Sequence, residues 1–296
     1  MSIQGEKYVL YHYNPSLAAA AAFAAVFGIS AILHATQMSL RRTWYFIPFV
    51  IGGLFETIGY SARAVNGNQS PDWSVTAYAI QSLMLLLAPT LFAASIYMIL
   101  ARIVKLTDGE EHSVIRVKWL TPTFVTGDVL SFLVQSGGGG LMVQAKTQKK
   151  LDTAQNMITG GLGIQVVFFV FFMIVTVLFH IRMRKAPSLR SQSLSVPWEQ
   201  YIYVLYAASI LILIRSVFRI AEYVGGSDGV LLSKEMYLYI FDAALMFLTM
   251  VLFNLRHPSH IIAGKKDLER EAESAGSNYP MQDTVDRTSV RVEQKR

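Results

Sequence analysis

The feature that most restricts the fold of this chain is a series of long apolar blocks separated by short polar stretches. A helix needs about 20 consecutive apolar residues to cross the hydrocarbon core of a bilayer, and the blocks are of about that length or longer. Only 16% of the residues are charged, whereas a soluble domain carries roughly a quarter. The sequence therefore predicts an all-α membrane protein.

Seven blocks have the length and the flanking residues of membrane-spanning helices. Of the 26 lysines and arginines, 18 lie at the ends of the first, third and fifth blocks, in the loops after them or in the C-terminal region, and five lie on the opposite side. Because basic residues accumulate in cytosolic loops, the N-terminus is expected outside and the C-terminus in the cytosol. The predicted spans of this seven-helix bundle are 16–39, 44–65, 73–104, 119–139, 154–182, 199–225 and 235–255.

Three parts of the chain follow from this topology. Residues 1–15 form a short outer segment, residues 16–255 form the transmembrane domain, and residues 256–296 have the polar, charged composition of a disordered cytosolic tail. No basic stretch precedes an apolar core at the N-terminus, so the first helix is expected to act as a signal anchor. Asn68 begins a glycosylation sequon in a predicted outer loop.

Seven ionisable residues interrupt the predicted helices. Each would cost about 2.5–3.5 kcal/mol at the bilayer centre, so we expect them to face the interior of the bundle and to meet partners there. Three of them recur at i, i+4 and i+7 and share one helix face. Three neutral glutamines extend the polar interior. The predicted binding residues are Glu56, Arg63, Gln81, Asp128, Gln135, Gln165, Arg215, Arg219, Glu222 and Asp242.

Depths counted at about 1.5 Å per residue place these charges in the middle and outer half of the membrane. The hypothesis is two ion pairs between the second and sixth helices, Glu56 with Arg215 and Arg63 with Glu222. Four acids and three arginines leave one carboxylate over, Asp128 or Asp242. A lone buried carboxylate tends to hold a proton, so proton coupling is an option. The alternative is that the ion pairs only fix the packing of the helices.

Several absences restrict the function. The chain has no P-loop motif and no cysteine, so neither ATP hydrolysis through a P-loop nor thiolate chemistry is expected. No lysine lies inside a predicted helix, which excludes an opsin-type Schiff base, and no histidine pair has the spacing of a zinc site. The basic charge faces anionic lipid rather than nucleic acid. We therefore expect no enzyme, no cofactor and no metal.

The polar residues also form a combination of motifs that resembles a known family. The pattern covers about residues 8–260 and is similar to the fungal RTA-like family, the lipid-translocating exporters associated with resistance to aminocholesterol. The matching residues are Tyr13-Asn14-Pro15, Glu56 with Gly59-Tyr60 and Arg63, Gln81 with Ala88-Pro89, Asp128 with Ser131 and Gln135, the glycines 137–140, Gly161 with Gln165, Arg215 with Arg219 and Glu222, Glu235 with Asp242, and His257-Pro258.

The resemblance implies a multi-pass protein of the plasma membrane or an internal membrane. It also implies movement of sphingoid long-chain bases, sterol-like toxins or, in one branch, porphyrin. An amphiphilic cation needs an acidic or polar site near one leaflet and an apolar surround for its chain, and the predicted binding residues suit such a head group. Two rivals stay open: a heptahelical sensor of lipid asymmetry whose tail binds cytosolic partners, and, more distantly, an intramembrane enzyme.

Overall fold

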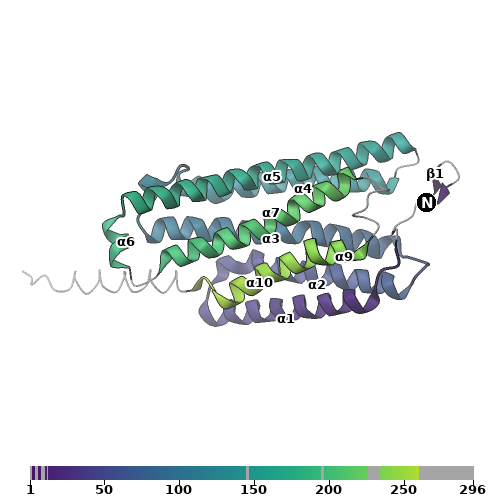
Figure 1. Ribbon diagram of the computed structural model, residues 1–296, viewed down its shortest axis with the longest axis horizontal. Coiled ribbons are helices and arrows are strands. Elements are labelled where there is room, and N and C mark those ends of the chain that lie inside the picture. The colour runs from purple at the N-terminus through teal and green to yellow at the C-terminus, as the bar shows by residue number, and fades with distance from the viewer. Residues whose placement is uncertain are drawn as a thin grey trace, which may run out of the picture.

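The computed structural model of this protein describes residues 2–3, 6–7, 11, 13–144, 147–194, 197–225 and 234–259. These residues are almost entirely helical, and the long helices lie side by side in one bundle (Figure 1). The bundle consists of α1 (Leu17–Arg41), α2 (Ile47–Asn68), α3 (Val75–Leu106), α4 (Val117–Gln144), α5 (Gln148–Lys185), α7 (Trp198–Val224), and a continuous segment of α9 (Glu235–Leu238), the π-helical turn η3 (Tyr239–Ala244) and α10 (Leu245–Leu255).

Short elements complete the described part of the chain. They are the antiparallel pair β1 (Ser2–Ile3) and β2 (Glu6–Lys7), the 3-10 turns η1 (Trp44–Phe46) and η2 (Glu110–His112), and α6 (Leu189–Ser193). From residue 260 onward, the predicted tail lies outside the described residues. We name the end of the bundle where α1 begins the outer end, after the predicted topology, and the opposite end the inner end.

Local sequence features fix where the helices begin and end. The hydroxyl of Ser16 accepts the Ala19 N–H at 3.3 Å and caps α1, and Ser74 caps α3 in the same way. Pro48 lies in the first turn of α2, where the N–H that it lacks would have no partner within the helix. Arg42 ends α1 with a left-handed φ of 54°.

Two helices extend farthest past their predicted boundaries. The helix α5 begins at Gln148 instead of residue 154, so Lys149 lies in its first turn rather than in a loop. At the other side of the same connection, α4 continues to Gln144 instead of ending at residue 139. The apolar pattern ends at the hydrocarbon boundary, whereas backbone hydrogen bonding carries these helices beyond it.

Five helices of the described chain are long and apolar enough to cross a membrane: α1, α3, α5 from Lys149, α7 and the segment Glu235–Leu255. The protein is therefore an all-helical integral membrane protein. The helix α2 packs between α1 and α3, and α4 packs along α5. The helices α3 and α7 lie between the pair of α4 and α5 and the pair of α1 and α2 (Figure 1). Charged side chains in α2, and glycine and polar residues in α4, interrupt the apolar stretches of these two helices.

The prediction that the charges face inward is confirmed. Glu56 and Asp242 are 0% exposed, Arg215 is 1% exposed and Asp128 is 4% exposed. The perimeter carries apolar side chains instead, among them Ile32, Leu133, Val167 and Val217. Charges inside and aliphatic side chains outside are what a bundle surrounded by lipid requires.

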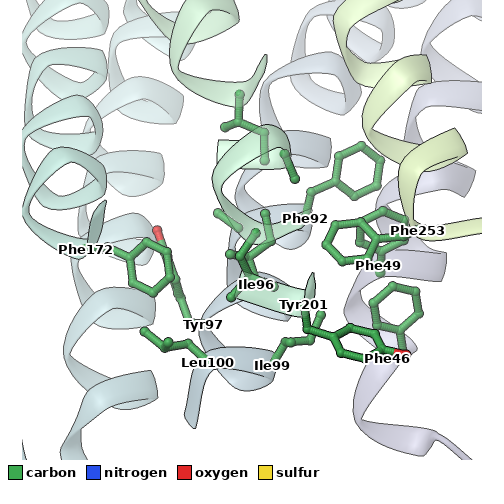
Figure 2. Packing of buried hydrophobic residues seen from close by; sticks show 14 of the residues in the cluster. Phe46, Phe49, Phe92, Ile96, Tyr97, Ile99, Leu100, Phe172, Tyr201 and Phe253 are labelled. Atoms are coloured by element: carbon green, nitrogen blue, oxygen red, sulfur yellow. The ribbon is translucent and has the colours of Figure 1, made fainter. Parts of the chain in front are cut away.

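The inner half of the bundle is filled by aromatic and aliphatic side chains (Figure 2). The rings of Phe46 and Phe49 stack with their centroids 4.5 Å apart, and Phe92 lies 4.5 Å from Phe49. Phe253 of α10 packs edge-on against Phe49 at 5.1 Å. These contacts join α2, α3 and α10 into a tightly packed inner end, while the charges gather farther out.

Candidate functional site

The outermost ion pair joins α2 to the start of α9. The guanidinium of Arg63 is completely buried, and its Nη2 donates to Glu235 Oε1 at 2.8 Å and to the hydroxyl of Tyr13 at 2.9 Å. Its Nε donates to the hydroxyl of Tyr239 at 3.2 Å. Glu235 also accepts the backbone N–H of Ser16 at 3.0 Å. One arginine therefore holds together α2, α9 and the segment before α1.

A second group of charges lies deeper, between α7 and η3. Arg215 Nε donates to Asp242 Oδ1 at 2.6 Å, and both side chains are 1% exposed. Arg219 Nη1 donates to Glu222 Oε2 at 2.6 Å, one turn along the same helix, and lies 4.0 Å from Asp242 Oδ2. Asp242 therefore sits within reach of two guanidinium groups.

Both predicted ion pairs are wrong. Arg215 pairs with Asp242 instead of Glu56, and Arg63 pairs with Glu235 instead of Glu222. The physical reason is that α9 and η3 supply a carboxylate to each of the two helices. Acids on this bridging segment reach the guanidinium groups of α2 and α7, which need not pair directly across the bundle.

Pro89 explains how α3 takes part in this network. A proline has no N–H, so the carbonyl of Leu85, four residues earlier, loses its helical partner. Nη2 of Arg215 donates to that carbonyl. The kink-forming residue that the sequence singles out thus creates a buried acceptor, and the guanidinium of α7 satisfies it.

Glu56 is the acid that the ion pairs leave over in the centre. It is 0% exposed, and neither of its carboxyl oxygens has a hydrogen-bond partner among the described residues. Asp242, Arg215 and Arg219 act on it electrostatically without closing an ion pair. The buried hydroxyl of Tyr60, one turn along α2, also lacks a hydrogen-bond partner among the described residues.

Asp128 occupies a separate place on α4. Its carboxyl interacts with the hydroxyl of Tyr97 on α3, although neither group reaches an aligned hydrogen bond. Within the described chain, no ion pair reaches Asp128. Of the two carboxylates predicted to be left over, Asp128 is therefore unpaired and Asp242 is not, while Glu56 is unpaired as well.

The three predicted glutamines lie in two separate parts of the bundle, between α4 and α5 and at the outer end. Gln135 Nε2 donates to Ser131 Oγ at 2.6 Å and to Gln165 Oε1 at 3.3 Å, and Ser131 Oγ donates to the carbonyl of Gly161 at 2.6 Å. A Cβ on Gly161 would lie 2.7 Å from Gln135 Cγ, so only glycine allows α5 to approach α4 this closely. Gln81 belongs to the outer end, where its Oε1 accepts the hydroxyl of Tyr11 at 2.7 Å.

The segment before α1 closes over the outer end of the bundle. Tyr11 is 5% exposed, accepts from Asn66 Nδ2 at 3.1 Å, and packs edge-on against Trp73 and Tyr78 with ring centroids 5.3 and 5.2 Å away. Arg63 lies 5.5–5.6 Å from the ring centroids of Tyr11 and Tyr13. Burial raises the pKa of both tyrosines above their ordinary value, so both stay neutral. Tyrosines next to a predicted span are typical of the membrane interface, but Tyr11 and Tyr13 pack into the closure of the outer end instead.

Sequence reasoning missed several members of the site. Glu235 and Tyr239 belong to the site but are not among the predicted binding residues. Their spacing at i and i+4 was the available signal, because it aligns both with one helix face. For Tyr60 and Asn66 the alignment with Glu56 and Arg63 along α2 was a weaker signal of the same kind.

The fold and the site together define the class of protein: a polytopic helical membrane protein whose outer half encloses a network of buried ion pairs. A sequence profile described as RTA1 like protein matches residues 49–265, and the chain belongs to this family. The resemblance stated from the motifs is thereby confirmed.

The chain is 35% identical over 290 residues to protoporphyrin uptake protein 1 of Saccharomyces cerevisiae, covering 86% of this chain and 94% of that protein. It is 33% identical over 303 residues to protein RTA1 of the same yeast, covering 92% and 93% of the two chains. It is 27% identical over 274 residues to a sphingoid long-chain base transporter, RSB1, also of Saccharomyces cerevisiae, covering 81% and 71%. No solved structure matches this chain.

Proposed function

We propose that this protein is a transporter that moves lipid-like amphiphiles between the leaflets of a membrane, or out of it, without hydrolysing ATP. The observation that carries the proposal is the buried group of acids and arginines in the outer half of the bundle. Such groups inside a membrane bundle are expensive, and they typically mark substrate or ion pathways. Relatives named as a sphingoid long-chain base transporter and a protoporphyrin uptake protein support the same class of cargo.

The proposed topology has seven spans, an outer N-terminus and a cytosolic C-terminus. It includes α2 and α4 as spans because both pack along neighbouring long helices of the bundle, and because their polar side chains are buried rather than presented to lipid. The plasma membrane is the proposed location. The basic loops then face the anionic cytosolic leaflet.

The proposed binding region is the central group of Glu56, Arg215, Arg219, Glu222 and Asp242, which we name the central charge group. A cationic head group would take the place of an arginine beside these acids, and an anionic one would take the place of an acid beside the arginines. Arg63 and Gln81 belong to the closure at the outer end. Asp128, Gln135 and Gln165 would orient a cargo that passes along α4 and α5.

A liposome assay tests the transport proposal. Purified protein is reconstituted with a fluorescent sphingoid base, and a membrane-impermeant quencher reports how fast the probe changes leaflets. The expected result is movement at least tenfold faster than in protein-free liposomes. Asp242→Asn should remove most of this increase, while Glu110→Gln, on exposed η2, should keep it. Movement no faster than in protein-free liposomes overturns the transporter, and competition by protoporphyrin tells whether an anionic cargo shares the site.

A sensor of membrane lipids is the second candidate, and the packing at the inner end favours it. The contacts among Phe46, Phe49, Phe92 and Phe253 fill the interior there, which suits a bundle that relays a change of shape. Deleting the tail after residue 260 separates the two functions. A sensor loses its output to cytosolic partners, whereas a transporter keeps its rate in liposomes.

A further inference from the structure

The geometry points to Glu56 as a proton-binding site of this protein, with the proton controlling which carboxylate holds Arg215. This inference rests on the proposed transport function, and it names the proton as the ion whose movement is coupled to transport. It begins from the pairing of charges in the described bundle. Arg63, Arg215 and Arg219 each have a carboxylate within 2.8 Å, and these pairs engage Glu235, Asp242 and Glu222. Glu56 lies beside them and has no such pair.

The surroundings of Glu56 favour the neutral carboxylic acid. A buried carboxylate without hydrogen bonds is so costly that it takes up a proton instead of staying charged. Both oxygens of Glu56 meet this condition, because they are inaccessible and have no hydrogen-bond donor among the described residues. The nearby guanidinium groups of Arg215 and Arg219 are already committed to Asp242 and Glu222.

Among the described residues, the charged groups that act on Glu56 lie on α7 and η3, and a polar neighbour lies on α2 itself. Arg215 and Arg219 of α7 favour its charged form, while Asp242 of η3 opposes it. The hydroxyl of Tyr60, on α2, is its other polar neighbour. From the adjacent helices, His34 of α1 is held by the carbonyl of Met250, and Tyr97 of α3 faces Asp128. Tyr78 of α3 packs on Tyr11 and acts on Arg219.

Losing the proton would change the pairing. Glu56–COOH would become Glu56–COO⁻, and the released proton would pass to water at the outer end. The new carboxylate would then compete with Asp242 for Nε of Arg215, which would draw α7 towards α2 and loosen its bond to η3. Asp242 lies within the π-helical turn, and such turns, with their i→i+5 hydrogen bonds, occur frequently at functional sites. One proton is thereby linked to one exchange of ion pairs.

The proton itself is detected by infrared spectroscopy of the whole protein in liposomes at neutral pH. The carboxylic acid C=O band of wild type should lose intensity in Glu56→Gln, and a pH rise should shift that intensity to the carboxylate bands in wild type but not in Glu56→Gln. Asp128→Asn should remove a different component, and Glu110→Gln should leave the acid band unchanged. An acid band that Glu56→Gln leaves unchanged overturns the proton site.

The coupling is tested with the fluorescent sphingoid base in the same liposomes. Wild type should move the probe at least threefold faster with a pH gradient than without one, and the ratio should fall to one in Glu56→Gln. Movement that ignores the gradient in wild type overturns the coupling while the proposed transport stands. Absence of movement in every sample instead refutes the proposed transport, and the infrared band still decides whether Glu56 binds a proton.

Discussion

Replacing Asp242 with asparagine tests the central charge group most directly. The substitution keeps the shape of the side chain and removes the negative charge that lies 2.6 Å from Nε of Arg215. Breaking a buried ion pair by removing one partner costs about 3–5 kcal/mol, because the other charge stays buried. Arg215 retains its hydrogen bond to the carbonyl of Leu85, and a hydrogen bond to a charged group contributes about 1.5–3 kcal/mol. The loss is therefore expected at the lower end, about 3 kcal/mol.

The assay is thermal unfolding in detergent, followed by tryptophan fluorescence. At about 2–4 °C per kcal/mol for a chain of this size, Asp242→Asn should lower the Tm by about 6–12 °C. The control is Glu110→Gln, an exposed change from acid to amide that should stay within about 0.5 kcal/mol of wild type.

A double variant sharpens this test. Arg215→Met with Asp242→Leu removes both charges, and replacing a buried ion pair by apolar residues is often neutral. The double variant should therefore be more stable than Asp242→Asn alone, by about 1–3 kcal/mol. An Asp242→Asn protein that melts within 2 °C of wild type would refute the argument that Arg215 depends on Asp242, whatever the double variant does. A shift of 2 °C corresponds to about 0.5 kcal/mol for a chain of this size.

Two further predictions concern the packing of α4 on α5 and the closure of the outer end. Gly161→Ala places a Cβ 2.7 Å from Gln135 Cγ and should destabilise the protein by about 1–3 kcal/mol. The control is Gly160→Ala, whose Cβ meets nothing within 4 Å and which should be neutral or slightly stabilising. Equal Tm values for the two variants would contradict the close approach of α5 to α4. Tyr13→Phe removes a hydrogen bond to Arg63 and should speed hydrogen–deuterium exchange in residues 11–16 by about tenfold. Tyr203→Phe, at the exposed surface of the inner end, should leave this exchange unchanged. Unaltered exchange in Tyr13→Phe would contradict the packing of the segment before α1 onto the outer end.

The sequence was sufficient to predict the long helices and the inward orientation of the charged side chains. Block length alone identified the helical segments, since the cost of exposing backbone polar groups to lipid leaves few alternatives. The inward orientation of Glu56, Asp128, Arg215 and Asp242 followed from the cost of charge at mid-bilayer. Both arguments depend on large energies that act on single helices, and such energies leave clear patterns in a sequence.

The same arguments do not predict which carboxylate pairs with which arginine. Depth along each helix places Glu56 near Arg215, yet depth says nothing about which helix lies between them. The π-helical turn at Asp242 and the free carbonyl of Leu85 arise from backbone geometry at single residues. Glu235 begins its helix, where an acid is ordinarily a response to the helix dipole, so its position alone does not predict a buried ion pair. Here it accepts from the guanidinium of Arg63 and from the backbone N–H of Ser16.

The distribution of polar and aromatic contacts indicates which end of the bundle opens first. The outer end is held by hydrogen bonds around Arg63, Glu235 and Tyr13, which water can replace one at a time. The inner end is held by aromatic packing around Phe49, which gains nothing from water and separates only when α2, α3 and α10 move together. If Glu56 binds a proton as proposed, opening at the outer end would give that proton a route to solvent. A change that weakens the outer closure, such as Tyr13→Phe, should therefore speed the response of Glu56 to external pH, whereas loosening the inner aromatic cluster should not.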